Sequence, residues 1–329
     1  MKKLISLLLA LTLCLLSLSA AFADAEAGKA YKAGIIMLIE NGAFLDMKTG
    51  IIQGLAGLGY VEGENLTIDY QCAQGDATNL QTICQNMADS DYDVVFTIAT
   101  PPTQAFVGLE SAIPNVFCSV AAPVVAGVMS DLDTPDMNAT GTSNAIPSGD
   151  IISMGLQITP DVKTFGLIYA TSEVNAVNAM NTAKSWLDAN GYAYVEKTVA
   201  NSGEVQTATQ AVLDQGADVL FIANDSVVQA AVDILAELAT EEGVPTYCCS
   251  ATTVQSGCLA TLAMSDIYIG EETAKIADLV LNGTPVAEIP AEVVPANIVS
   301  INQDTLAALG LEVPASLSEL GEVQYLTAN

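Results

Sequence analysis

The feature that most restricts the fold is an alternation of short apolar runs with longer segments of helical period along most of the chain. The runs are rich in Val, Ile and Phe, and this alternation is typical of βαβ units with a parallel sheet. We expect helices in most of the gaps, including one over 267–281. The strands are expected near residues 32–39, 66–71, 93–99, 115–119, 164–169, 193–198, 218–223, 245–249 and 258–263.

The second half of the chain repeats the first. Residues 93–100 resemble 218–224, and residues 113–119 resemble 244–250 in the same order. This predicts a duplicated unit and hence an α/β fold of two similar Rossmann-like lobes. We place lobe 1 at residues 30–145 plus 265–290, and lobe 2 at 146–264 plus 291–329. The polar stretch 131–147 is expected to be the first crossing between the lobes, and Ser265-Asp266 a return.

The N-terminus has the form of a secretory signal. Met1-Lys2-Lys3 precedes an apolar run, and Ala21-Phe22-Ala23 offers a cleavage site, so residues 1–23 are expected to be a signal peptide. We expect an exported protein, periplasmic or extracellular on the outer side of the cytoplasmic membrane. No comparable apolar stretch follows, so no direct membrane insertion is expected after signal removal. Cys14 lacks the small preceding residue of a lipidation site, and its lipidation stays open.

The charged residues exclude several classes of protein. The net charge is −29, and all nine basic residues are Lys, so binding to nucleic acid is not expected. Without Arg, a ligand carboxylate has to be met by backbone N–H groups, hydroxyls or a lysine. Without His, the commonest general base and zinc ligand are missing, and we expect no metal or cofactor. An even number of cysteines follows the signal, which allows disulfides, but their apolar surroundings favour free buried thiols.

Polar residues gather where the expected strands end. In a parallel sheet these carboxyl ends meet at one edge, and two facing lobes bring both edges to one cleft. Each residue alone could also be a helix N-cap, as Thr100, Ser172, Asp225 and Ser250 are well suited to be. We expect Glu173 and Asp225 to hold a positive ligand group, and the helix start at Thr100-Pro101 to seat a carboxylate. The expected ligand-binding residues at these strand ends are Glu40, Asn41, Thr100, Ser119, Glu173, Asn175, Asn224, Asp225 and Ser250.

Nearly the whole of the chain after the signal resembles the ABC-importer substrate-binding proteins related to tryptophan- and tyrosine-binding lipoproteins. The motifs that carry the resemblance are Gly54-Leu55 with Gly59 to Asn65, Ala73-Gln74-Gly75-Asp76 with Asn79-Leu80, Ile98 to Pro101 with Gln104-Ala105, Tyr169 with Glu173 and Asn175, and Asn224-Asp225. The resemblance implies a type I periplasmic-binding-protein fold, capture of an amino acid, with aromatic amino acids among the candidates, and delivery to ABC permease subunits. It also implies a site lined by Thr100, Gln104, Ser119, Glu173, Asn175 and Asp225, which adds Gln104 to the expected ligand-binding residues. Ala122, Ala170 and Ala176 depart from residues common in relatives.

Other classes of function stay open on the same scaffold. A binder of a sugar, nucleoside or other metabolite, or an exported ligand sensor, would use the same two lobes. An enzyme is not expected, because the chain has no His, no metal-ligand spacing and no nucleophile with a base. The acid pair Glu40 and Asp46 lacks a partner pattern. We expect a monomer.

Overall fold

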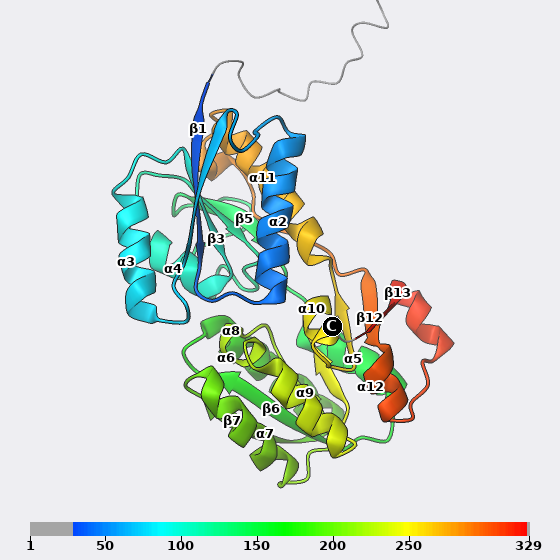
Figure 1. Ribbon diagram of the computed structural model, residues 1–329. Helices are drawn as coiled ribbons and strands as arrows, with labels where there is room; N and C mark the ends of the chain where they lie inside the picture. The colour runs from blue at the N-terminus through cyan, green and yellow to red at the C-terminus, as the bar shows by residue number, and fades with distance from the viewer. Residues whose placement is uncertain (1–28, 328–329) are drawn as a thin grey trace, which may run out of the picture.

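The computed structural model describes residues 29–327, which form two α/β lobes joined end to end (Figure 1). The expected signal peptide and Cys14 lie outside the described residues. Between residues 29 and 327, no helix has both the length and the apolar character that a bilayer crossing needs. All six cysteines of this range are free.

The first lobe is a six-stranded sheet in the order β11-β5-β4-β3-β1-β2, parallel throughout. Its strands are β1 (Tyr31–Met37), β2 (Leu66–Cys72), β3 (Val94–Ile98), β4 (Asn115–Cys118), β5 (Ala139–Ser143) and β11 (Glu292–Val293). Its helices are α2 (Gly42–Gly57), α3 (Ala77–Ala88), α4 (Thr100–Val107), α11 (Asp266–Leu281) and the 3₁₀ turn η2 (Val286–Glu288).

The second lobe is a seven-stranded sheet in the order β13-β12-β10-β9-β8-β6-β7. Its strands are β6 (Thr164–Ala170), β7 (Ala193–Val199), β8 (Val219–Phe221), β9 (Thr246–Cys248), β10 (Ala260–Ala263), β12 (Ile298–Asn302) and β13 (Glu322–Leu326). Only the β10–β12 pairing is antiparallel. Its helices are α5 (Ser148–Ile158), α6 (Val174–Asn190), α7 (Val205–Leu213), α8 (Ser226–Gln229), α9 (Val232–Glu241), α10 (Ala251–Gln255) and α12 (Gln303–Ala308), with the 3₁₀ turns η1 (Ser202–Glu204) and η3 (Ala315–Glu319).

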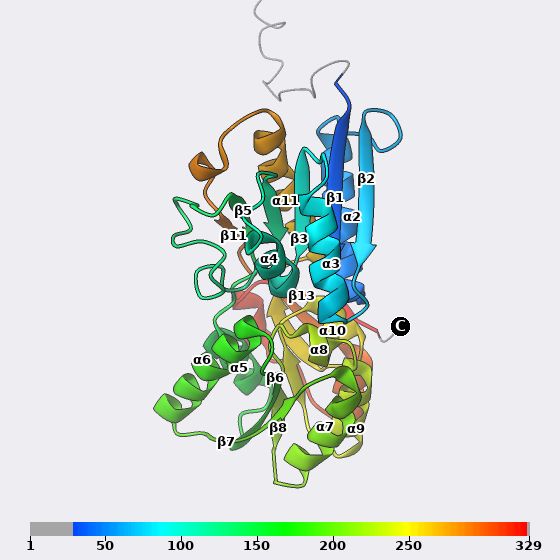
Figure 2. The same cartoon turned by 90° about the vertical axis from the view of Figure 1, so that its left-hand side faces the viewer.

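The strand order confirms the expected pair of similar lobes. The run β2-β1-β3-β4-β5 in the first sheet has the same order as β7-β6-β8-β9-β10 in the second. Figure 2 shows one lobe above the other, with α8 and α10 of the lower lobe next to the boundary. The carboxyl ends of both sets of strands therefore lead toward the same region.

The connections between the lobes differ in detail from the expectation. The stretch 131–147, expected to be a crossing, contains the buried strand β5, whose sequence Ala-Thr-Gly-Thr-Ser has no Val, Ile or aromatic residue. Gly141 makes this strand possible, because a Cβ there would lie 2.0 Å from the carbonyl oxygen of Phe117. The pairing of β11 with β5 also keeps Glu292–Val293 in the first sheet, beyond the boundary expected at residue 290.

The first sheet buries apolar side chains on both faces. Ile35 and Met37 pack in the cluster that includes α2 and α11, whereas Ile36 between them packs with residues of α3 and α4. Alternate residues of a strand point to opposite faces, so an apolar run without polar gaps fits a sheet covered on both sides. Burying each such side chain contributes about 1.5–3 kcal/mol.

Helices α2 and α11 pack with their backbones in close approach. A Cβ on Gly50 would lie 2.1 Å from the carbonyl oxygen of Ile267, and a Cβ on Gly270 would lie 2.3 Å from that of Met47. A Cβ on Gly54 would lie 2.7 Å from the Cβ of Ala274. Gly50 and Gly54 of α2 thus serve the packing of the two helices. This packing places α11, which follows β10 of the second lobe, firmly on the first.

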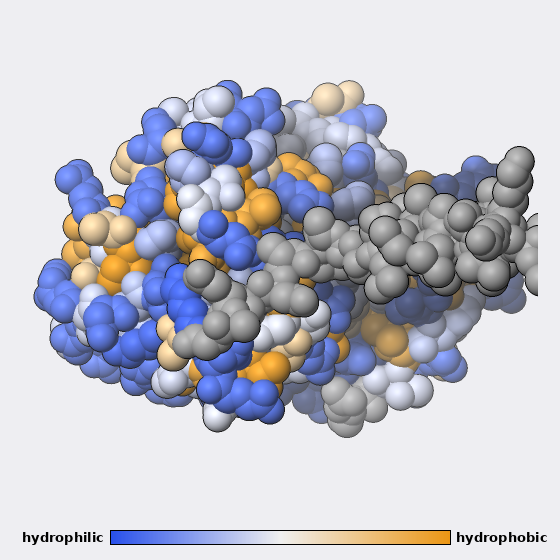
Figure 3. Space-filling view, turned by 90° about the horizontal axis from the view of Figure 1, so that it is seen from above, coloured by the Kyte–Doolittle hydropathy of each residue, from blue (hydrophilic) through white to orange (hydrophobic). Residues whose placement is uncertain are grey.

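The surface reflects the acidic composition. Seen from above, the visible face is mostly hydrophilic, and its hydrophobic residues form small separate patches (Figure 3). Among the described residues three salt bridges occur, all with at least one exposed partner. Exposed pairs of this kind contribute little to stability, and the apolar cores carry the fold.

Candidate functional site

A narrow cavity of about 20 Å³, room for about one water molecule, lies between the two lobes. Its position at the carboxyl ends of the strands is the usual one for ligand sites in open α/β sheets. Its wall is lined by Ala43, Phe44, Met47, Ala99, Thr100, Ser119, Ala121, Asn144, Asn175, Asn224, Asp225, Ser226, Gln229, Cys249, Ser250 and Asp266. Both lobes therefore contribute to one site.

The start of α4 presents hydrogen-bond donors to the cavity. Ala99 has φ 73° and ψ 173°, a backbone conformation that costs a residue with a Cβ about 1–3 kcal/mol. Buried hydrogen bonds stabilise this turn. The Thr103 hydroxyl donates to the Ala99 carbonyl (2.8 Å) and lies 2.9 Å from the Thr97 hydroxyl. Because Pro101 and Pro102 have no N–H, Thr100 supplies the free N–H of this first turn. The expected N-cap role of Thr100 is wrong, because Ala99 occupies that position.

Ser119 adds a second strained residue with a hydroxyl on the wall. Its φ is 64°, and its N–H donates to Thr142 Oγ1 at 3.3 Å. Thr100 and Ser119 are 2% and 6% exposed, and no described residue is hydrogen-bonded to either hydroxyl. The first lobe thus presents to the cavity two hydroxyls and one N–H that have no hydrogen-bond partner among the described residues.

Two asparagines present acceptors to the same cavity. Asn144 Oδ1 and Asn175 Oδ1 are buried and receive no hydrogen bond from the described residues. The Asn175 amide is oriented by its Nδ2 group, which donates to the Asn224 carbonyl at 2.7 Å. A buried acceptor left unpaired costs about 1–3 kcal/mol, so both oxygens favour a ligand that brings donors.

Asp225 lines the cavity, but its carboxylate is occupied by backbone groups. Its Oδ1 accepts from the N–H groups of Val227 and Val228, both at 3.0 Å, so it caps α8. Its Oδ2 accepts from the N–H of Ala170 at 2.6 Å, which ties α8 to the end of β6. Burial raises the pKa of the Asp225 carboxyl, and these three N–H donors oppose the rise.

Glu173 is buried beside Asp225 and is not part of the cavity wall. Its Oε2 accepts from the N–H and hydroxyl of Ser226, at 3.1 and 3.3 Å, while its Oε1 has no partner among the described residues. Burial, with the neighbouring charge of Asp225, raises the pKa of Glu173 to about 7. Glu173 thus stands one layer behind the cavity.

Asp266 is the carboxylate that the sequence reasoning missed as a site residue. It is the first residue of α11, and its Oδ2 accepts from the hydroxyls of Ser250 (3.1 Å) and Thr252 (2.6 Å). Burial raises the pKa of Asp266 to about 6, and the two hydroxyl bonds oppose the rise. Its position directly after a strand end, at the expected return between lobes, was the signal that could have identified it.

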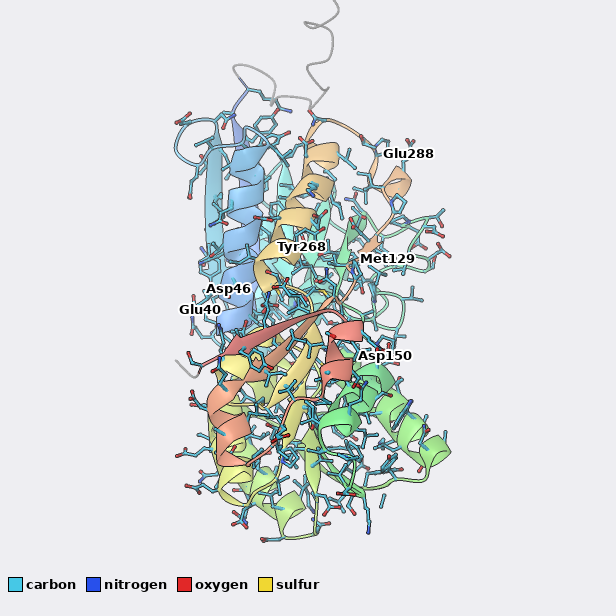
Figure 4. The ribbon with its side chains drawn as sticks, turned by 90° about the vertical axis from the view of Figure 1, so that its right-hand side faces the viewer. Glu40, Asp46, Met129, Asp150, Tyr268 and Glu288 are labelled. Carbon is cyan, nitrogen blue, oxygen red and sulfur yellow. The ribbon has the colours of Figure 1, made fainter. Side chains whose placement is uncertain are left out.

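The expected ligand-binding residues other than Glu173 fall into three groups. Thr100, Ser119, Asn175, Asn224, Asp225 and Ser250 line the cavity. Asn41 caps α2, accepting from the Phe44 N–H at 2.9 Å, and lines a separate small pocket between α2 and α10. Glu40 and Gln104 are outside the wall: the Tyr70 hydroxyl donates to Glu40 Oε1 at 2.6 Å, and Gln104 Nε2 donates to the Ala126 carbonyl at 2.8 Å. Figure 4 places Glu40 and Asp46 at the end of α2 nearest the second lobe.

The apolar part of the wall was also missed. Phe44 and Met47 are buried residues of α2, the helix that follows the first strand. Their helical spacing is also typical of ordinary core residues, so the sequence did not mark them as part of a site. With Ala43, Ala121 and Cys249 they form a surface for an apolar ligand group. A wider groove of about 310 Å³ adjoins the cavity and shares Asn144 and Asn175 with it. Within residues 29–327 no three His, Cys, Asp or Glu side chains are grouped to hold a metal ion.

Comparison with known proteins gives consistent results. The family model for ABC transporter substrate binding proteins matches residues 32–323. The tyrosine-binding protein of Clostridioides difficile (strain R20291) is 31% identical over 287 residues, which cover 87% of this chain and 83% of that protein.

Two solved structures are informative about the arrangement of the lobes. A Streptococcus pneumoniae ABC domain in complex with L-Trp is 25% identical and matches with a TM-score of 0.85, covering 90% of this chain and 100% of that one. The ligand-free, open structure of a Clostridium difficile substrate-binding protein with adhesive properties is 31% identical, with a TM-score of 0.69 and coverage of 91% and 100%. The L-Trp complex superposes better on this chain than the ligand-free, open structure does, although its sequence is less similar. The lobes here are therefore arranged more as in the liganded structure.

Proposed function

The chain belongs to the ABC transporter substrate-binding protein family, and on that premise we propose that it captures an amino acid with an aromatic side chain between its lobes. We further propose that it is exported, acts as a monomer in the periplasm or outside the cell, and delivers its ligand to ABC permease subunits. In this role it binds its ligand without changing it chemically.

One observation carries the choice of an amino acid: the cavity presents unpaired donors and unpaired acceptors together. The hydroxyls of Thr100 and Ser119 and the Thr100 N–H can donate to a carboxylate without any Arg. The oxygens of Asn144 and Asn175 can accept from an ammonium group. A zwitterion satisfies both sets with charge-assisted bonds, which are about twice as strong as the neutral bonds that a polyol would make.

The apolar wall supports an aromatic side chain. Phe44 and Met47 are 7% and 3% exposed and border the cavity from α2. A ring buried against them gains hydrophobic energy, and contacts of sulfur or an aromatic edge with the ring add about 0.5–1.5 kcal/mol. Two of the related proteins, one in complex with L-Trp and one named for binding tyrosine, have ligands with such a ring.

Thermal denaturation with a ligand panel tests the proposal. L-Tyr, L-Trp and L-Phe should raise Tm in a concentration-dependent manner, because a ligand that binds only the folded state stabilises it. Sugars, polyols and nucleosides serve as controls on the same fold. If one of these raises Tm while all amino acids leave it unchanged, the amino-acid proposal is wrong. Loss of labelled-ligand uptake on removal of this protein would separate an importer subunit from a sensor.

A further inference from the structure

The cavity wall contains two carboxylates, and in only one of them is an oxygen without any hydrogen-bond partner among the described residues. Asp225 receives three backbone N–H bonds shared over both of its oxygens. Asp266 receives both of its hydrogen bonds, from Ser250 and Thr252, on Oδ2. No described residue donates to Asp266 Oδ1, although the side chain is among the lining residues and Asp266 is 9% exposed.

The surroundings of Asp266 contain no cation to neutralise it. The three salt bridges of residues 29–327 involve Lys32, Lys184 and Lys275, and no lysine lines the cavity. The charged group that acts on it is Asp46 of α2, which has the same sign. A buried carboxylate without a counter-charge is costly, so a positive ligand group placed at Oδ1 would gain a strong charge-assisted bond.

Asp266 also lies at a hydrogen-bonded contact between the two lobes. It starts α11, which packs on α2 of the first lobe, while Ser250 and Thr252 belong to the start of α10 in the second lobe. Figure 4 shows the neighbouring Tyr268 at the end of α11 nearest the second lobe. The two oxygens of this carboxylate thus differ: Oδ2 accepts hydrogen bonds from the second lobe, and Oδ1 has no partner among the described residues.

We infer that Asp266 recognises the ammonium group of the ligand through Oδ1, in place of the Glu173 and Asp225 pair that the sequence suggests. This inference rests on the proposed function, because it takes the ligand to be an amino acid. Asp225 then acts as a structural tie between α8 and β6, and Glu173 supports α8 from behind the wall. The same side chain, Asp266, then takes part both in ligand binding and in the contact between the closed lobes.

The test compares two ligands that differ only in the ammonium group. Binding of L-tyrosine and of 3-(4-hydroxyphenyl)propionate is measured by calorimetry for the wild type, Asp266→Asn, Thr252→Val and Asp46→Asn. Asp266→Asn should weaken L-tyrosine binding about 10- to 100-fold and the deaminated analogue much less, as expected when a hydrogen bond to a charged group is lost. Asn can still accept the two hydroxyl bonds, so the variant keeps the tie to α10.

Two controls separate recognition from other effects. Thr252→Val removes a donor to Oδ2 and should weaken both ligands by the same factor. Asp46→Asn removes a nearby negative charge from outside the wall, and should leave the ratio of the two affinities within about twofold, since Asp46 is only half-buried and solvent screens its charge.

Each result decides between the two proposals. If Asp266→Asn lowers the affinity for both ligands equally, or for neither, the role of Asp266 is overturned and the proposed function stands. If the wild type binds tyramine but not L-tyrosine, and Asp266→Asn abolishes this, the role of Asp266 stands without the amino-acid proposal. Binding of only an uncharged compound such as myo-inositol would overturn both.

Discussion

Gly42 of the first lobe packs directly against Thr252 of the second. A Cβ built on Gly42 would lie 2.5 Å from Thr252 Cγ2, too close for two carbon atoms that are not bonded. The same Thr252 donates its hydroxyl to Asp266 at 2.6 Å. The arrangement of the lobes therefore requires a residue without a side chain at the start of α2.

Gly42→Ala is expected to weaken ligand binding by about tenfold or more, because the added methyl group disfavours the closed arrangement and lowers the competent fraction. Thr252→Ser removes Cγ2 and keeps the hydroxyl, so the double variant should recover most of the affinity. Gly57→Ala is the matched control on the same helix, since nothing lies within 4 Å of its Cβ position. Calorimetry with X-ray scattering of the liganded protein measures both affinity and closure. Unchanged affinity in Gly42→Ala would contradict this role.

Glu173→Gln is expected to stabilise the unliganded protein at pH 8 relative to pH 5. Burial raises the pKa of Glu173 to about 7 from an ordinary 4.5, so the folded state holds the proton more tightly than the unfolded chain. The wild type therefore loses stability as pH rises from about 4.5 to 7, by up to about 3 kcal/mol, and the Gln variant lacks this loss. Urea denaturation at both pH values measures the difference. An equal difference at pH 5 and pH 8 would argue against the raised pKa.

Asp225→Asn is expected to destabilise the protein by about 2 kcal/mol even without ligand. The variant turns an amide NH₂ group toward the Ala170 N–H, which the carboxylate accepts at 2.6 Å in the wild type, and leaves that buried donor unpaired. Asp161→Asn, at an exposed turn, is the control and should leave the free energy of unfolding unchanged. Denaturation of both variants at pH 7 measures this effect, and wild-type stability in Asp225→Asn would contradict the structural role.

Gly50→Ala is expected to lower the free energy of unfolding by at least about 2 kcal/mol. Its Cβ would meet the Ile267 carbonyl at 2.1 Å, and backbone atoms of two packed helices cannot yield without separating. Gly57→Ala again serves as control, with a small gain expected from helix propensity. Urea denaturation measures both. A neutral Gly50→Ala would mean that α2 and α11 can move apart at little cost.

Affinity for an amino acid is expected to fall as pH is lowered below about 6. Burial raises the pKa of Asp266 to about 6, and its protonated form no longer attracts an ammonium group. Asp266→Asn should remove this part of the pH dependence, while protonation of Glu173 remains in both proteins. Calorimetric titrations from pH 5 to pH 8 measure the slope. The same slope in both proteins would exclude Asp266 as its source.

Most strands could be predicted because their signal is local. β1 and β3 consist mostly of apolar residues, and such runs are typical of strands buried on both faces. β5 has no such signal, since its burial depends on Gly141 lying against Phe117 of the neighbouring strand. The polar strand ends were likewise visible, and six of the ten expected residues line the cavity. Glu40 follows the same pattern but accepts from Tyr70, and Gln104, expected from the family resemblance, donates to Ala126.

The sequence by itself determined two similar α/β lobes, the polar edge where they meet, and a site without Arg or His. These follow from residue type and from spacing along the chain. Only the tertiary structure decided which acid has an oxygen left for a ligand. That depends on donors far away in sequence, the Ala170 N–H on Asp225 and the Ser250 and Thr252 hydroxyls on one oxygen of Asp266. A carboxylate's capacity to bind is set by the partners that folding brings to it, and no local pattern records them.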